Sequence, residues 1–214
     1  MHRDPNELLP DKNSAASTGR FSPDSVAGSN SEPLATPTPA CPYRVMDVAA
    51  IVDRRRWLVD HTTVDNETSG THSWFARALT LLGPQSPSLE HLESLLELVF
   101  HYDAAANLAL PENRSVLVRT GAREVIRELA NRILDGGGIS DSNRFKEIVD
   151  GIKAAVPFRS RVIFHPLRLA LAGRTGDGDL DRVILVLDPA AKLPFAVKVK
   201  DTRERMLEFC AALD

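Results

Sequence analysis

The chain has 214 residues, of which 43% are hydrophobic, and a formal net charge of −3. Its length suits one or two globular domains, and its longest apolar runs fall far short of the roughly 20 residues that a membrane-spanning helix needs. The balanced charge argues against a protein that grips nucleic acid over its whole surface. The charge is uneven, however, because residues 144–214 hold 13 Lys and Arg against 10 Asp and Glu and are mildly basic.

Residues 1–43 have the composition of a disordered tail, with seven of the 14 prolines and few aromatic residues. Such a segment cannot bury enough apolar surface to offset the entropy lost on ordering. The first residues mix both charges and lead into no apolar run, which argues against a secretory signal and favours a cytoplasmic protein. Cys41 and Cys210 lie near opposite ends of the chain, and we expect reduced thiols outside any disulfide.

Three helices are predicted in the next part of the chain from the spacing of apolar residues. The first runs from Met46 toward Leu58, with Asp47 as its cap. The second covers residues 73–82 and is ended by a left-handed Gly83 followed by proline. The third begins within Ser86-Pro87-Ser88-Leu89, where the proline suits the first turn, and is the most regular of the three. Its apolar stripe comprises Leu89, Leu92, Leu95, Leu96 and Val99.

Two further helices are predicted after a loop around Pro111. Thr120 can cap the first, which the glycine run at 136–138 ends. Asp141 or Ser142 can cap the second, which carries Ile148, Val149 and Ile152 on its inner side. The expected core face of the first helix comprises Val125, Ile126, Leu129 and Ile133.

The stretch Phe-His-Pro-Leu-Arg-Leu-Ala-Leu-Ala-Gly-Arg at residues 164–174, here called the 164–174 motif, pairs a helix start with a helix stop. Pro166 suits a first helical turn, and Gly173 suits the left-handed position after a helix end. The helix left between them, residues 167–172, is too short to be stable without tertiary support. We therefore expect its leucines to be packed inside the protein.

The remaining segment predicts two more helices. Asp179 or Asp181 begins one that runs to Leu187, and Asp201-Thr202-Arg203-Glu204 has the pattern of a capping box for the last. Residues 195–200 alternate in polarity as a short strand does, but no partner strand is evident. The expected buried face of the last helix comprises Met206, Leu207, Cys210 and Leu213.

These elements predict an all-α, helical-bundle fold in which a helical segment at 44–140 precedes a domain at 141–214. The 164–174 motif, together with the residues after it, resembles the C-terminal anticodon-binding region of bacterial-type glutamyl-tRNA synthetases of class I. In that family a phrase ending in Pro-Leu-Arg-x-Ala-Leu-x-Gly-Arg precedes a loop with glycine and acidic residues and then two helices. Here residues 175–179 match the loop, and the resemblance covers about residues 143–213.

The resemblance implies an anticodon-binding-domain-like protein that binds tRNA or another structured RNA. It implies no catalysis by the chain alone, because the His-x-Gly-His and Lys-Met-Ser-Lys-Ser elements and the Rossmann core of the family are not found, and we expect no cofactor. Two alternatives stay open. The chain is a separate subunit or fragment of a glutamate-tRNA ligase that works with a synthetase catalytic chain in tRNA aminoacylation, or it is a degenerate domain reused as a protein-protein interaction module.

The candidate RNA-binding residues of the motif region are Arg168 and Arg174, together with Arg159 and Arg161 just before the motif. A guanidinium is planar and always charged, so it can bind a phosphate through two hydrogen bonds. The alternative interpretation is that Arg168 braces the end of a helix and that Arg174 is a surface charge.

A second candidate set is the run Arg54, Arg55 and Arg56 followed by Trp57, which could hold a phosphate and stack a base. The alternative is a solvated helix face.

No metal is expected. The acidic stretch at 177–181 departs from a calcium loop, because Arg182 stands where that loop needs glycine. The six histidines show no zinc spacing, and His165 suits a helix cap or a core position better than a general base.

Overall fold

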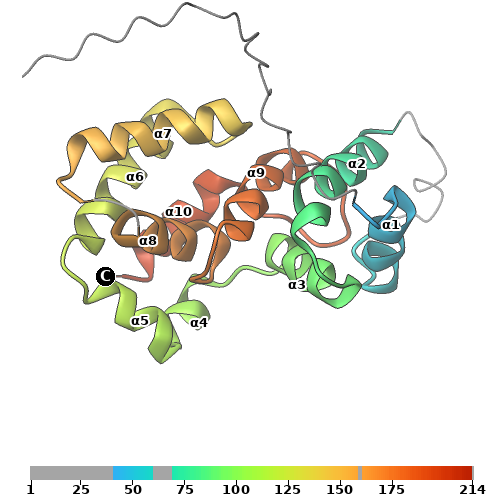
Figure 1. Cartoon of the computed structure of the whole chain (residues 1–214), viewed down its shortest axis with the longest axis horizontal. Helices are drawn as coiled ribbons and strands as arrows, with labels where there is room; N and C mark the ends of the chain where they lie inside the picture. Colours follow the sequence, from blue (N-terminus) through green and yellow to red (C-terminus); the bar gives the residue numbers. More distant parts are fainter. Residues whose placement is uncertain (1–40, 60–68, 159–160, 214) are drawn as a thin grey trace, which may run out of the picture. The chain divides into compact units, whose positions relative to one another are not determined.

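Ten α-helices make up the part of the chain that the computed structural model describes, residues 41–59, 69–158 and 161–213 (Figure 1). Within these ranges there is no strand, so the predicted all-α class is confirmed. The strand pattern at 195–200 is represented there by one isolated antiparallel bridge between Leu58 and Phe195. None of the described helices combines the length and apolar character that a membrane span requires. Almost all of the predicted disordered tail, residues 1–40, lies outside the described residues.

The first three helices are α1 (Val45–Arg54), α2 (Gly70–Leu82) and α3 (Leu89–Phe100), with a 3-10 turn at Gly83–Gln85 before α3. Helix α3 starts in the predicted Ser-Pro-Ser-Leu stretch, but Pro87 lies before the helix and not in its first turn. Ser88 is the cap, and its hydroxyl accepts the amide of the third helical residue at 3.2 Å. The predicted stripe of α3 is buried except for Leu89 at its start.

Two predicted helix ends in this region are wrong. Asp47 is not the cap of α1 but its third residue, and its carboxylate accepts the amide of Arg44 in a capping box. Gly83 is right-handed, with φ −59°, because the chain continues into the 3-10 turn instead of leaving the helix.

The middle of the chain forms α4 (Ala104–Ala109), α5 (Pro111–Leu117) and α6 (Ala122–Gly136). The loop predicted around Pro111 is wrong, because this proline begins α5 at the position where its missing N–H costs nothing. The cap of α6 is Gly121 rather than Thr120, since the turn between α5 and α6 requires a left-handed residue with φ 89°. The predicted core face of α6 is buried.

The last four helices are α7 (Ser142–Ala155), α8 (Arg161–Ala172), α9 (Asp179–Ala191) and α10 (Thr202–Ala211). Asp141 caps α7, and its carboxylate accepts two backbone amides at 2.8 and 3.0 Å. The capping box predicted for α10 is present.

The expected start of α8 at Pro166 is wrong, because α8 begins at Arg161 and carries this proline in its interior. The buried face predicted for α10 is also partly wrong. Met206 is buried, but Leu207 and Leu213 are 49% and 38% exposed. Their places inside are taken by Phe209 and by Arg205, which has no exposed surface at all.

One hydrophobic cluster runs through the described helices, and α9 is central to it. Helix α9 packs on α2, α3 and α8, while α6 packs on α7, α8 and α10. Residues 183–187 of α9 are all buried, which is the pattern of a helix surrounded by others. The boundary predicted between residues 140 and 141 falls in the loop between α6 and α7, and helices on both sides of it share this core.

Candidate nucleic-acid interface

The 164–174 motif forms the last three-quarters of α8 and the turn that follows it. Pro166 has no N–H for the carbonyl four residues earlier, yet the helix continues through it because its surroundings are buried. Gly173 is left-handed, with φ 78°, as the sequence predicts, and its amide donates to the Leu169 carbonyl at 3.1 Å. The motif is thus a packed helical segment that ends abruptly at a left-handed glycine.

Side chains from other helices complete the end of α8. The Tyr102 hydroxyl donates to the carbonyl of Ala170 at 2.5 Å, and the Arg205 guanidinium donates to the carbonyl of Leu171 at 2.8 Å. These carbonyls belong to the last turn, where no helical amide follows to bind them. Burial raises the pKa of Tyr102, which therefore stays a neutral donor.

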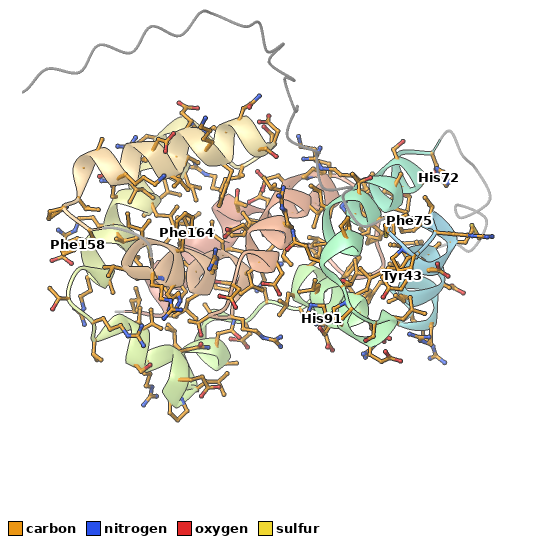
Figure 2. All side chains as sticks on the ribbon, viewed as in Figure 1. Tyr43, His72, Phe75, His91, Phe158 and Phe164 are labelled. Carbon is orange, nitrogen blue, oxygen red and sulfur yellow. The ribbon has the colours of Figure 1, made fainter. Side chains whose placement is uncertain are left out.

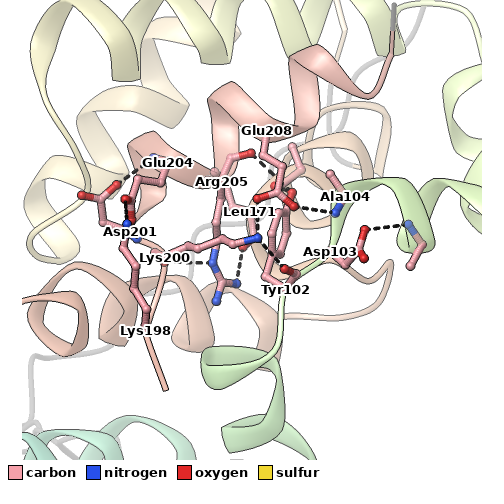
Figure 3. Close-up of polar contacts among 12 residues, drawn as sticks. Tyr102, Asp103, Ala104, Leu171, Lys198, Lys200, Asp201, Glu204, Arg205 and Glu208 are labelled. Carbon is pink, nitrogen blue, oxygen red and sulfur yellow. Dashed lines mark hydrogen bonds and ion pairs between the residues drawn. The ribbon is translucent and has the colours of Figure 1, made fainter. Parts of the chain in front are cut away.

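Arg205 is a buried cation that joins three segments, and Figure 3 shows its contacts with Leu171 and Lys200. Besides the carbonyl of Leu171 in α8, it donates to the carbonyls of Leu98 and Val99 in the last turn of α3, at 2.9 and 2.7 Å. It also donates to the backbone carbonyl of Lys200, at 3.1 Å. Its guanidinium also lies 4.6 Å from the centre of the Tyr102 ring. Burial lowers the pKa of Arg205 to about 10, and the hydrogen bonds hold it as a structural cap.

Arg168 is directed into the protein. Its Nε and Nη2 atoms bind the two carboxylate oxygens of Asp181, both at 2.7 Å, and its Nη1 donates to the Gly176 carbonyl at 2.6 Å. The residue is 9% exposed, and its guanidinium lies 5.1 Å from the centre of the Phe164 ring. Because each nitrogen has an internal partner, this geometry corresponds to the bracing role, and we leave Arg168 out of the candidate interface.

Arg174 is exposed and lines a hollow of about 490 Å³ between α3 and the loop that joins α8 to α9. The loop contributes residues 175–178, including Asp177, and the start of α9 contributes Asp179 and Leu180. Helix α3 and the turn before it contribute Gln85, His91 and Ser94. The imidazole of His91 lies 3.8 Å from the Asp179 carboxylate. The hollow therefore offers a cation, carboxylates, an amide and a hydroxyl to a ligand.

Arg161 is exposed at the start of α8, and His165 lies one turn later on the same helix. The pKa of His165 is lowered first by burial and then by the charges of Arg119, Arg168 and Arg161, with Asp177 opposing them. Arg119 lies in the exposed turn between α5 and α6, and no sequence pattern groups it with α8. The structure thus adds Arg119 to the candidate residues. Arg159 lies outside the described residues.

The second predicted set, Arg54 to Trp57, does not lie on one surface, because its members have different surroundings. Arg54 and Arg55 are exposed but both bind the carboxylate of Glu93 on α3, and Arg55 also approaches Glu97 at 3.8 Å. Arg56 is exposed in a left-handed conformation, with φ 57°.

Trp57 is 2% exposed and stacks on Phe100 with ring centres 4.2 Å apart, so its face is used within the core and not available to a base. We therefore leave this set out of the candidate interface.

Within the described ranges, no group of three or more His, Cys, Asp or Glu side chains could hold a metal ion. Comparisons of the chain with family models, with curated proteins and with solved structures found no match. The resemblance to the synthetase region therefore stays a prediction that depends on the 164–174 motif and the segments after it.

Proposed function

We propose that this protein binds RNA, tRNA above all, and that the hollow beside Arg174 receives one unstacked base. The observation that carries this proposal is the placement of the motif. Its inner part is used to fix α8 against α9, whereas its last residue, Arg174, and the loop after it are presented at the surface around the hollow. The family resemblance predicts RNA contact at this end of the protein.

The dimensions and chemistry of the hollow suit a base better than a phosphate. Its volume of about 490 Å³ lies within the range of small-ligand sites, which is about 300 to 1,000 Å³. The carboxylates of Asp177 and Asp179 would repel a phosphate, but they can accept hydrogen bonds from the exocyclic amino group of a base. Arg174 can donate to a base carbonyl or stack on its face, as arginines do in single-stranded RNA sites.

The test is a fluorescence anisotropy titration with labelled total tRNA and with an unstructured RNA oligonucleotide. We expect the wild-type protein to bind with an affinity that falls as salt rises, because phosphate contacts release counterions. Arg174→Gln should weaken binding by about tenfold, which corresponds to the loss of one charge-assisted hydrogen bond.

The matched control is Lys192→Gln, which removes one positive charge just beyond the end of α9. The next residue, Leu193, packs on Gly70 at the start of α2. The Lys192 variant should bind like the wild type. An affinity that does not change with salt, or an Arg174 variant equal to the control, would count against the proposal.

If a pull-down from the host recovered a protein partner and no RNA, the interaction-module alternative would be selected. Aminoacylation that required this chain together with a separate catalytic chain would select the ligase-subunit alternative.

A further inference from the structure

Two segments that are distant in the sequence meet at Gly121, in the turn between α5 and α6. A Cβ added to this glycine would lie within 2.5 to 2.7 Å of three atoms of the Phe158 ring, which lies just before α8 (Figure 2). Phe158 therefore anchors the approach to α8 against the turn that holds Arg119. Helices α5 and α6 both pack on α8, so the turn between them is fixed beside α8.

This junction gathers positive charge at the surface. Arg119 and Arg161 are both exposed, and neither takes part in an ion pair among the described residues. Arg168, by contrast, is neutralised by Asp181. The charged groups that act on the half-buried His165 come from the α5–α6 turn, from α8 and from the α8–α9 loop. They are Arg119, Arg161, Arg168 and Asp177.

We propose that Arg119, Arg161 and His165 form a subsite for one phosphodiester of an RNA backbone, adjoining the hollow beside Arg174. This inference rests on the proposed RNA-binding function and deepens it. Asp177 lines the hollow and also acts on His165, so the two places are neighbours. A strand whose base enters the hollow can thus place a neighbouring phosphate between the two arginines.

The chemistry of the three side chains fits a phosphodiester. Two guanidinium groups supply directed donors to the anionic oxygens, and charge-assisted bonds of this kind are the stronger hydrogen bonds of proteins. A phosphate placed there would also favour the protonated form of His165, whose pKa is lowered in the free protein by burial and by the arginines around it. RNA binding should therefore raise the pKa of His165.

The experiment compares Arg119→Gln, Arg161→Gln and the double variant with the Lys192→Gln control, using the same RNA oligonucleotide at two salt concentrations. Each exposed arginine can be replaced without disturbing the core, and circular dichroism verifies the fold. For single-stranded RNA, one phosphate contact changes the affinity by about fivefold at 0.1 M salt, so the double variant, which removes both arginine donors to this one phosphate, should lose about fivefold. The slope of log affinity against log salt should become shallower by about 0.7 in the double variant.

A second readout follows the His165 imidazole by NMR during titration with inorganic phosphate and with the oligonucleotide. We expect its pKa to rise on binding in the wild type and not in the double variant. If the double variant binds RNA like the Lys192 control, the subsite is overturned while RNA binding stands. If the wild type binds no RNA, the proposed function fails, and a phosphate-dependent shift of His165 then shows that only a small-anion site is present.

Discussion

Replacing Arg205 with methionine should destabilise the protein strongly, although this residue is hidden from every ligand. Methionine keeps much of the side-chain volume but removes the donors to four backbone carbonyls, at Leu98, Val99, Leu171 and Lys200. Hydrogen bonds from a charged donor contribute about 2 kcal/mol each.

The loss is partly offset, because the variant no longer has to keep a charge away from water. Burial lowers the pKa of Arg205 from its ordinary value to about 10, and this shift corresponds to about 3 kcal/mol. We therefore expect the free energy of unfolding to fall by about 5 kcal/mol, a large part of the roughly 5 to 15 kcal/mol that is typical of a domain.

Urea unfolding followed by circular dichroism measures this change. Arg203→Met is the matched control, because Arg203 lies on the same helix, is exposed and makes one hydrogen bond, to the Leu134 carbonyl. Its free energy of unfolding should change by about 1 kcal/mol or less. If Arg205→Met were no more destabilising than Arg203→Met, the view of Arg205 as the cap of two helices would be refuted.

Three further predictions concern the scaffold of the candidate interface. Arg168→Gln should lower the free energy of unfolding by about 3 kcal/mol, because it leaves the Asp181 carboxylate without its charge partner. In a double-mutant cycle measured by urea unfolding, Asp181→Asn should lower the free energy of unfolding less in the Arg168→Gln background than in the wild type. Gly121→Ala should cost at least about 2 kcal/mol in the same assay, because φ is 89° and a ring fills the space, whereas Gly178→Ala, with φ −67° and open space around it, should have little effect. Burial raises the pKa of Asp188, so the folded state binds the proton of this carboxyl more tightly than the unfolded state does. The stability of the wild type relative to Asp188→Asn should therefore be greatest below pH 3.8 and fall as pH rises through the higher pKa of the folded state. A stability difference that does not change with pH would contradict this.

The sequence predicted those helices whose pattern is local. The capping box of α10, the start of α3 in a serine-proline-serine stretch and the glycine end of α6 depend on residues within one turn of each other, and all are present. Pro166 was misleading because its preference for a first turn is only a local tendency, and the packing around α8 overrides it. The short helices α4 and α5 were missed because six or seven residues show too little periodicity to be recognised.

The candidate interface was predictable only in part, because side-chain direction is a property of the tertiary structure. Arg168 and Arg174 look alike in the sequence, yet one binds Asp181 and the other lies at the surface. Trp57 follows three exposed arginines but is held by Phe100 in the core. Arg119 could not be grouped with α8 from spacing alone, since the contact between Gly121 and Phe158 brings it there.

The long sequence separation between Arg205 and α3 affects the order in which the protein can be completed during synthesis. The final turn of α3 is made early, but the guanidinium that satisfies its carbonyls is translated more than 100 residues later. A nascent chain therefore emerges from the ribosome with α3 and α8 unfinished at their C-terminal ends. The native fold can be completed only after Arg205 has emerged, and truncation just before this residue would leave the C-terminal ends of both helices without this donor.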